Sequence, residues 1–283
     1  MTIAAPAPSR DTAHGEAHSS RRAGWAAFRA LLLRDLTVLA KDLKEFLPNT
    51  LMQPAMLVFV FTFVFPRIGQ GIGGSGNAGL FSTILLGGLV AQSIAFQGLF
   101  RVALPLAREL DVTNELEDRV LAPAPISVIA LEKIVAGALQ GLFAGLVVFP
   151  IAALLPATPV YLRANWGTLA IVTVLSCYAS AALGLTLGTR IAARLVPILL
   201  GFIALPLAFF GAIFYTWEAL APIGWLKAAV LVNPVVYMSE GFRASLSEGV
   251  GHMPLGIVVA SLAGFSVLFT VLGIRGFRKR VLG

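Results

Sequence analysis

The side chains best suited to specific chemistry lie in one charged segment, residues 101–127. This segment, RVALPLARELDVTNELEDRVLAPAPIS, places five carboxylates among three arginines. Thr113 or Asn114 can cap a short helix within it, and Pro123 and Pro125 end that helix. The helix would contain Glu115, Leu116, Glu117, Asp118 and Arg119. A charged helix of this kind is suited to docking a soluble partner, and an ordinary solvated loop is the alternative that residue chemistry leaves open.

The sequence offers no set of residues for catalysis or for a metal ion. It lacks a Gly-x4-Gly-Lys-Ser/Thr phosphate loop, and no glycine-rich loop opens a helix after a predicted strand. Any ATP and Mg²⁺ would therefore be bound by a partner chain. Cys177 is the single cysteine and lies in an apolar run, while His14 and His18 are isolated histidines. We expect no enzymatic activity, cofactor or metal site in this chain itself.

Composition places the chain in the membrane. Of its 283 residues 58% are hydrophobic and only 12% are charged, and its mean hydropathy is +0.87. A soluble domain has about a quarter of its residues charged. The net charge of +7 is concentrated at the ends of apolar segments, which favours lipid headgroups over nucleic acid as the partner.

Six apolar runs are long enough to cross a bilayer as helices. A crossing of about 30 Å needs roughly 20 residues at 1.5 Å per residue. The runs are residues 47–66, 80–100, 134–155, 166–189, 195–214 and 254–274. An all-α integral membrane protein with six spans, residues 47–283, is the predicted fold.

The residues before the first span divide into two parts. Residues 1–24 lack periodicity and an apolar core, which predicts a disordered cytoplasmic tail. In residues 25–46 the apolar side chains recur at steps of three and four, which predicts an amphipathic helix in the membrane interface. Its polar faces carry Arg29, Arg34 and Lys41, and packing against a soluble partner is a compatible alternative.

The basic residues indicate how the spans are oriented. With six crossings, 17 of the 21 Lys and Arg residues fall on the side that holds both termini. Cytoplasmic loops carry the excess of basic residues, so both termini are predicted to be cytoplasmic, in a multi-pass protein of the cell membrane.

Residues 217–252 are predicted to re-enter the membrane without crossing it. Lys227 splits their apolar residues into two pieces, and the longer reaches only about 18 Å as a helix. A seventh crossing would also move the basic C-terminus to the outer side. Pro222, Gly224 and Asn233-Pro234 supply breaks. The prediction is a re-entrant helical hairpin on the outer face.

Small and aromatic residues leave further alternatives open. Two stripes of small residues allow close helix packing, within one chain or between two. They are Gly137, Gly141 and Gly145, and Ser180, Gly184 and Gly188. The aromatic residues near the outer ends of spans one and five form an interfacial belt or line a substrate path. The candidates for such a path are Phe59, Phe63, Phe210 and Phe214.

Two segments resemble one transporter family. Residues 214–246, FYTWEALAPIGWLKAAVLVNPVVYMSEGFRASL, are similar to the final extracellular segment of ABC-2-type export permeases. The positions that carry this resemblance are Asn233, Pro234, Tyr237, Glu240 and Arg243. The stretch LEDRVLAPAPISVIALEKIVAG resembles the coupling region of the same family. The family's usual proline after the aromatic run is replaced around Trp217 and Glu218.

The resemblance implies a permease that pairs with a second copy or a close relative. It would dock two cytoplasmic ATPase subunits through residues 115–119, as in daunorubicin-resistance and nodulation-factor exporters. Export of an amphipathic drug or lipid-like molecule is the leading expectation, and export of a lipid-linked polysaccharide is the alternative. An ion-coupled carrier is disfavoured because Glu132, Glu218 and Glu240 lie near segment ends and not in mid-membrane.

Overall fold

A computed structural model describes residues 28–35, 37–41, 43–68, 78–111, 126–156 and 160–282. Helices make up nearly all of this part of the chain, which confirms the all-α prediction. Its only extended pairing is an isolated antiparallel bridge between Leu162 and Ser247. The predicted tail, residues 1–24, lies outside the described residues and stays a prediction.

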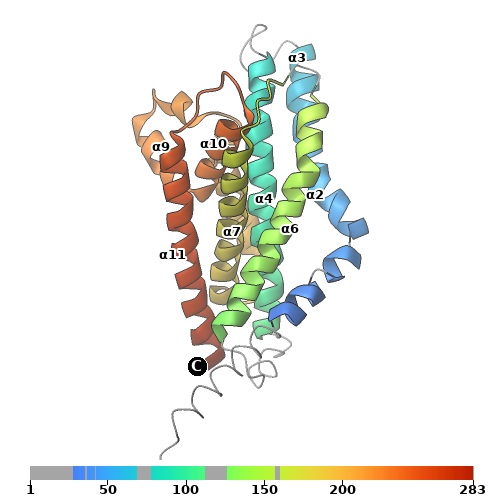
Figure 1. Cartoon of the computed structure of the whole chain (residues 1–283), viewed down its shortest axis with the longest axis vertical. Helices are drawn as coiled ribbons and strands as arrows, with labels where there is room; N and C mark the ends of the chain where they lie inside the picture. Colours follow the sequence, from blue (N-terminus) through green and yellow to red (C-terminus); the bar gives the residue numbers. More distant parts are fainter. Residues whose placement is uncertain are drawn as a thin grey trace, which may run out of the picture.

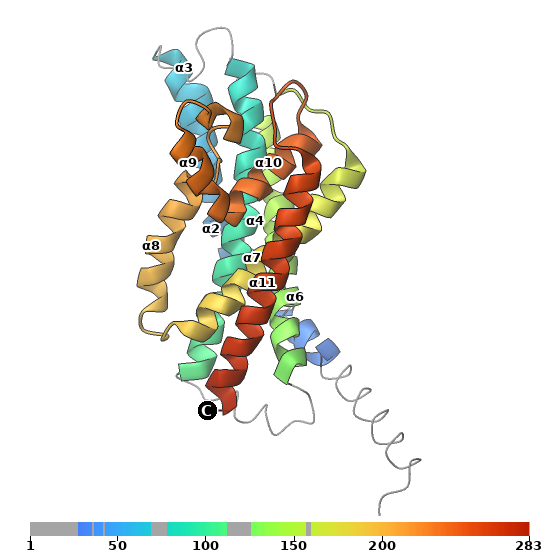
Figure 2. The ribbon, with the colours of Figure 1, turned by 90° about the vertical axis from the view of Figure 1, so that its left-hand side faces the viewer.

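Four long helices run side by side along the length of the molecule (Figures 1 and 2). They are α4 (Ala78–Asp111), α6 (Ile126–Leu154), α7 (Trp166–Arg190) and α11 (Leu255–Leu282). Within the described part of the chain, these are the four helices of at least 18 residues that are apolar enough to cross a membrane.

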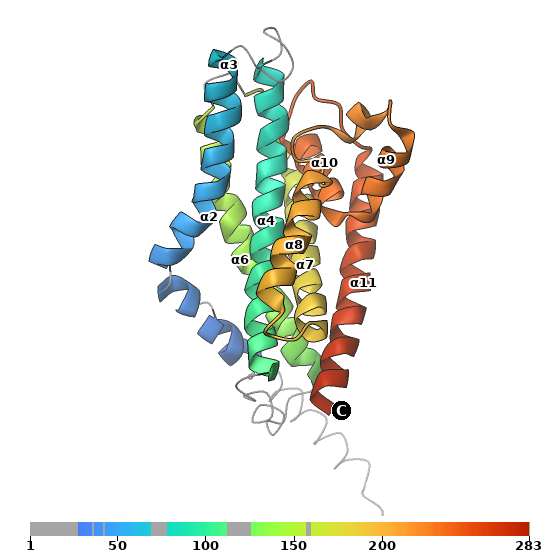
Figure 3. The same ribbon diagram turned by 180° about the vertical axis from the view of Figure 1, so that it is seen from behind.

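Shorter helices surround this bundle. The N-terminal part is helical over residues 28–35 and 37–41 and continues through α2, a π-helix and a last short turn. Figure 3 shows this run on one side of α4, with α8 and α9 on the other. The bounds are α2 (Leu43–Val58), η1 (Phe59–Val64), α3 (Phe65–Arg67), α8 (Val196–Phe209), η2 (Trp217–Leu220), α9 (Gly224–Ala229), η3 (Val230–Val232) and α10 (Pro234–Leu246).

The structure changes the length of several predicted spans. Predicted span one, residues 47–66, lies within the continuous helical run of α2, η1 and α3, whereas predicted span five corresponds to a shorter apolar helix, Val196–Phe209. With 14 residues, α8 reaches only about 21 Å. It ends at Phe209 and not at residue 214, because the next residues turn through Ala212, whose φ is 52°. Conversely, α4 continues past the predicted end at residue 100 as far as Asp111.

The small-residue stripes pack within the chain. A Cβ at Gly184 of α7 would lie 2.7 Å from the Leu99 carbonyl oxygen of α4. A Cβ at Gly141 of α6 would lie 3.1 Å from the Ile94 carbonyl oxygen, also in α4. The intrachain alternative is therefore confirmed for both stripes: they let α6 and α7 lie directly against α4.

The two ends of the bundle differ in charge. At the end that holds the C-terminus, α4, α7 and α11 finish and α6 and α8 begin (Figure 2). We call this the basic end, because most of the described Lys and Arg residues belong to the segments that meet there. We call the other the α10 end; the basic residues of its segments are Arg67, Arg163, Lys227 and Arg243.

Candidate functional site

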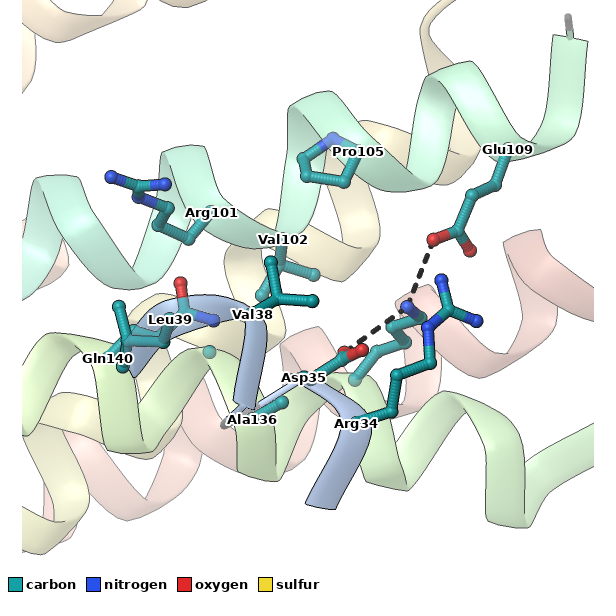
Figure 4. A pocket seen from close by; sticks show the side chains of 12 residues that line it. Arg34, Asp35, Val38, Leu39, Arg101, Val102, Pro105, Glu109, Ala136 and Gln140 are labelled. Carbon is teal, nitrogen blue, oxygen red and sulfur yellow. Dashed lines mark hydrogen bonds and ion pairs between the residues drawn. The ribbon is translucent and has the colours of Figure 1, made fainter. Parts of the chain in front are cut away.

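At the basic end, a buried lysine joins three helices. The Lys133 ammonium of α6 lies 3.1 Å from Glu109 Oε1 of α4 and 3.5 Å from Asp35 Oδ2 of the N-terminal helix. Figure 4 shows the two carboxylates approaching the same ammonium from different helices. The Lys133 side chain is only 9% exposed. Because water is largely excluded, removing one partner of this cluster would leave a poorly solvated charge behind, which costs more than breaking a surface ion pair.

A cavity of about 190 Å³ adjoins this ion-pair cluster. Its polar lining includes Arg34, Arg101 and Gln140, and its remaining walls are largely aliphatic residues of the same helices (Figure 4). Of the predicted interface-helix residues, Arg34 lines this cavity, while Arg29 and Lys41 lie exposed on the same helical stretch.

The last residue of α4 forms a second set of bonds. Asp111 accepts a hydrogen bond from the Arg280 guanidinium of α11. Its other carboxylate oxygen accepts from the Ala193 backbone N–H in the α7–α8 connection. Through Glu109 and Asp111, the end of α4 is bonded to α6, α11 and the α7–α8 connection, and Lys133 of α6 extends this set of contacts to the N-terminal helix.

The predicted docking residues Glu115, Leu116, Glu117, Asp118 and Arg119 lie outside the described residues. In the sequence they lie between Asp111, the last residue of α4, and Ile126, the first residue of α6.

At the α10 end, one buried arginine joins three segments: α10, α4 and the turn after α8. Arg243 of α10 is fully buried. Its Nε donates to the Ile84 carbonyl of α4 at 3.2 Å, and its Nη2 donates to the carbonyls of Ala212 and Ile213. Its Nη1 donates to Glu240 Oε1 at 3.0 Å. The guanidinium thereby satisfies carbonyls left without helical partners where the chain turns after α8.

Glu240 completes this cluster. It is also fully buried. Its Oε1 accepts from the Trp217 N–H and its Oε2 from the Met253 N–H, both at 2.8 Å. The pair Glu240–Arg243 thus fixes the segments that enter and leave the predicted hairpin.

The other predicted hairpin residues begin α10 and hold it in place. Asn233 caps α10 by accepting from the Val235 N–H at 2.9 Å, and Pro234 follows at the first helical position. The Asn233 side-chain amide also donates to the Leu207 carbonyl of α8 at 3.0 Å. The Tyr237 hydroxyl donates to the Leu231 carbonyl at 3.0 Å. All five predicted residues therefore lie in or directly before α10, which is buried along nearly its whole length.

A hydrogen bond from a tyrosine hydroxyl helps to shape the turn after α8. The Tyr215 hydroxyl donates to the Phe209 carbonyl at 2.9 Å. Burial raises the pKa of Tyr215 above its ordinary value, so the phenol stays protonated and keeps donating.

The four aromatic residues predicted for a substrate path come from two segments, η1 and the turn after α8. Phe59 and Phe63 stack on each other with centroids 5.1 Å apart and are both exposed. Phe214 packs against Phe61 with centroids 5.5 Å apart. Phe210 lines a groove.

That groove lies between α8 and α9 and measures about 440 Å³. Its walls include Phe202 and Trp225, each 74% exposed, and Phe210. Asn233 is the only polar side chain among its described lining residues, and both ends of its amide are already hydrogen-bonded.

Comparison with known proteins decides the family. Residues 26–247 match the sequence profile of the ABC-2 type transporter family. The chain belongs to this ABC-2 family. The inner membrane transport permease YadH of Escherichia coli strain K12 is 28% identical over 241 residues, which cover 82% of this chain and 90% of that protein. The protein of the same name from Shigella flexneri matches to the same extent.

Family membership confirms the resemblance drawn from the sequence. This ABC-2 permease is a multi-pass protein of the cytoplasmic membrane and the transmembrane subunit of an ABC transporter. The family implies a separate ATPase partner.

Sequence reasoning missed the partners of Lys133. It placed Lys133 beside Glu132, but adjacent residues on a helix point to different faces. The sequence feature that could have predicted them is the position of Lys133 at the end of an apolar run. A lysine buried there needs carboxylates from other helices as partners. Asp35 and Glu109 supply them.

Proposed function

We propose that this permease is the transmembrane subunit of an ATP-driven exporter. It moves an amphipathic drug or lipid-like molecule out of the cytoplasm or the inner leaflet. Two copies of a partner ATPase bind the ATP and Mg²⁺, and a second permease copy completes the pathway. The family match over residues 26–247 carries this proposal.

The groove beside α8 supports an amphipathic or apolar cargo. Its volume of about 440 Å³ falls within the range of about 300–1,000 Å³ usual for small-molecule sites. Its aromatic and aliphatic walls favour an apolar group, and they offer no charged partner to a strongly ionic substrate.

The bonded end of α4 supports coupling to an ATPase. In this proposal the segment around Glu115, Glu117 and Asp118 docks the ATPase. Its displacement passes to the N-terminal helix through Glu109 and Lys133, and to α11 through Asp111 and Arg280.

The docking role predicts a specific failure. Replacing Glu115, Glu117 and Asp118 together with alanine should lower transport by reconstituted permease and ATPase about tenfold, equivalent to about 1.4 kcal/mol in the barrier. Purified permease alone should hydrolyse no ATP. Transport of a labelled amphipathic substrate into inverted vesicles measures the effect. The Glu248→Ala variant, at the α10 end, is the control. Unchanged transport by the triple variant would contradict the docking role.

We also propose that the basic end faces the cytoplasm, with six crossings and a re-entrant segment from η2 to α10. The excess of Lys and Arg at that end supports this orientation. A fluorescent protein that matures only in the cytosol, fused after Gly283, should be bright in whole cells. The same reporter inserted after Arg163 should be dark. The opposite pattern would reverse the orientation and with it the direction of transport.

A further inference from the structure

A strongly basic cavity lies between the last residues of α7 and of α11. Its volume is about 530 Å³. Its lining residues are Thr189, Arg190, Arg275, Gly276, Lys279 and Arg280. Four of these six carry a positive charge, and none of the described lining residues is acidic.

Local geometry creates this concentration of charge. A Cβ at Gly276 would lie 2.6 Å from Thr189 Oγ1, so the glycine lets α11 approach the end of α7 closely. Arg275 and Lys279 are four residues apart on α11 and therefore lie on one face of the helix. Arg190 is the last residue of α7.

Among the described residues, Arg280 is the one cation of the four that has an ion-pair partner. Arg280 bonds Asp111 and also donates to the Thr189 carbonyl at 3.3 Å. Arg190, Arg275 and Lys279 are exposed, and none of the three forms an ion pair with a described residue. Like charges gathered around one cavity repel one another, and an anion placed between them removes that repulsion.

The surface that leads to the cavity is apolar. Leu268 and Val271 are 47% and 40% exposed. They lie on the same face of α11 as Arg275 and Lys279, because steps of three and four residues return to one side of a helix. An apolar strip therefore runs along α11 and ends at the cations. Such a surface is complementary to a lipid in which an acyl chain is joined to a phosphate headgroup.

We propose that this cavity binds the phosphate headgroup of an anionic phospholipid. The acyl chains lie along the exposed face of α11, and the phosphate contacts Arg275, Lys279 and Arg190. Basic residues beside a transmembrane helix attract the anionic phospholipids of the adjoining leaflet. A lipid phosphate in this cavity also lies next to Arg280 and so competes with Asp111 for that guanidinium.

The test measures lipid binding by the full-length permease alone, without ATPase or transport. Purified protein is titrated with phosphatidylglycerol and, separately, phosphatidylcholine, and bound lipid is counted by native mass spectrometry. We expect phosphatidylglycerol to bind more tightly. The double variant Arg275→Gln/Lys279→Gln should reduce its affinity about tenfold or more. The Arg190→Gln variant should reduce it as well, from the opposite wall of the cavity.

A control variant distinguishes binding in this cavity from general attraction between a basic protein and an anionic lipid. The double variant Arg163→Gln/Arg278→Gln removes the same charge from exposed residues that do not line the cavity. An equal loss in this control would overturn the site. Equal affinity for the two lipids, or displacement of phosphatidylglycerol by millimolar inorganic phosphate, would show a free-anion site and overturn the lipid assignment. Because no ATPase is present, these outcomes are independent of the export proposal.

Discussion

Replacing Arg243 with methionine is expected to lower the free energy of unfolding by about 3–5 kcal/mol. The variant would leave the fully buried Glu240 carboxylate without its cation. It would also remove the hydrogen bonds to the carbonyls of Ile84, Ala212 and Ile213. Each buried acceptor left unsatisfied costs about 1–3 kcal/mol. Because the cluster ties α4, α10 and the turn after α8 together, we expect the whole α10 end to loosen.

The measurement is the thermal unfolding midpoint of purified permease in detergent. Arg163→Met is the matched control, because Arg163 also pairs with a glutamate but both side chains are mostly exposed, at 75% and 60%. An exposed pair contributes about 0–1 kcal/mol, so this control should shift the midpoint little.

A double-variant cycle separates the ion pair from the other contacts of Arg243. Combining Arg243→Met with Glu240→Gln removes the uncompensated charge, so the combined loss should be smaller than the sum of the two single losses. Additive losses would contradict a direct Glu240–Arg243 interaction. An Arg243→Met midpoint equal to that of Arg163→Met would contradict the whole cluster.

Replacing Lys133 with methionine is expected to uncouple transport from ATP hydrolysis. The two carboxylates that approach it, Asp35 and Glu109, would lose the cation that joins them. Repulsion between them would separate the N-terminal helix from the end of α4. We expect transport by the reconstituted complex to fall about tenfold, or about 1.4 kcal/mol in barrier, while the partner ATPase still hydrolyses ATP.

Two further variants make this result specific. Lys44→Met removes an exposed lysine close to the same helix and should leave transport unchanged. Lys133→Arg keeps the charge and should retain more transport than Lys133→Met. If Lys133→Met transports at the parental rate per ATP hydrolysed, the cluster has a structural role alone.

The long apolar helices were predictable because hydrophobic length is a local property of the chain. The predicted span 166–189 and α7 (Trp166–Arg190) agree closely, since Asn165 caps the helix by accepting from the Thr168 N–H. The bias of basic residues likewise predicted which segment ends lie together. The five hairpin residues were identified through family resemblance, which marks positions but not their partners.

The amino-acid sequence by itself determined that this chain is an all-helical membrane protein of the ABC-2 family, because composition, periodicity and motif are all read along the chain. Only the tertiary structure decided where helices stop and which charges meet. The α8 helix ends at Phe209 beside carbonyls that Arg243, some 30 residues later, can satisfy. The α4 helix continues to Asp111, where its carboxylates meet cations of α6 and α11. Such contacts join residues distant in sequence, so hydropathy and spacing within one segment do not specify them.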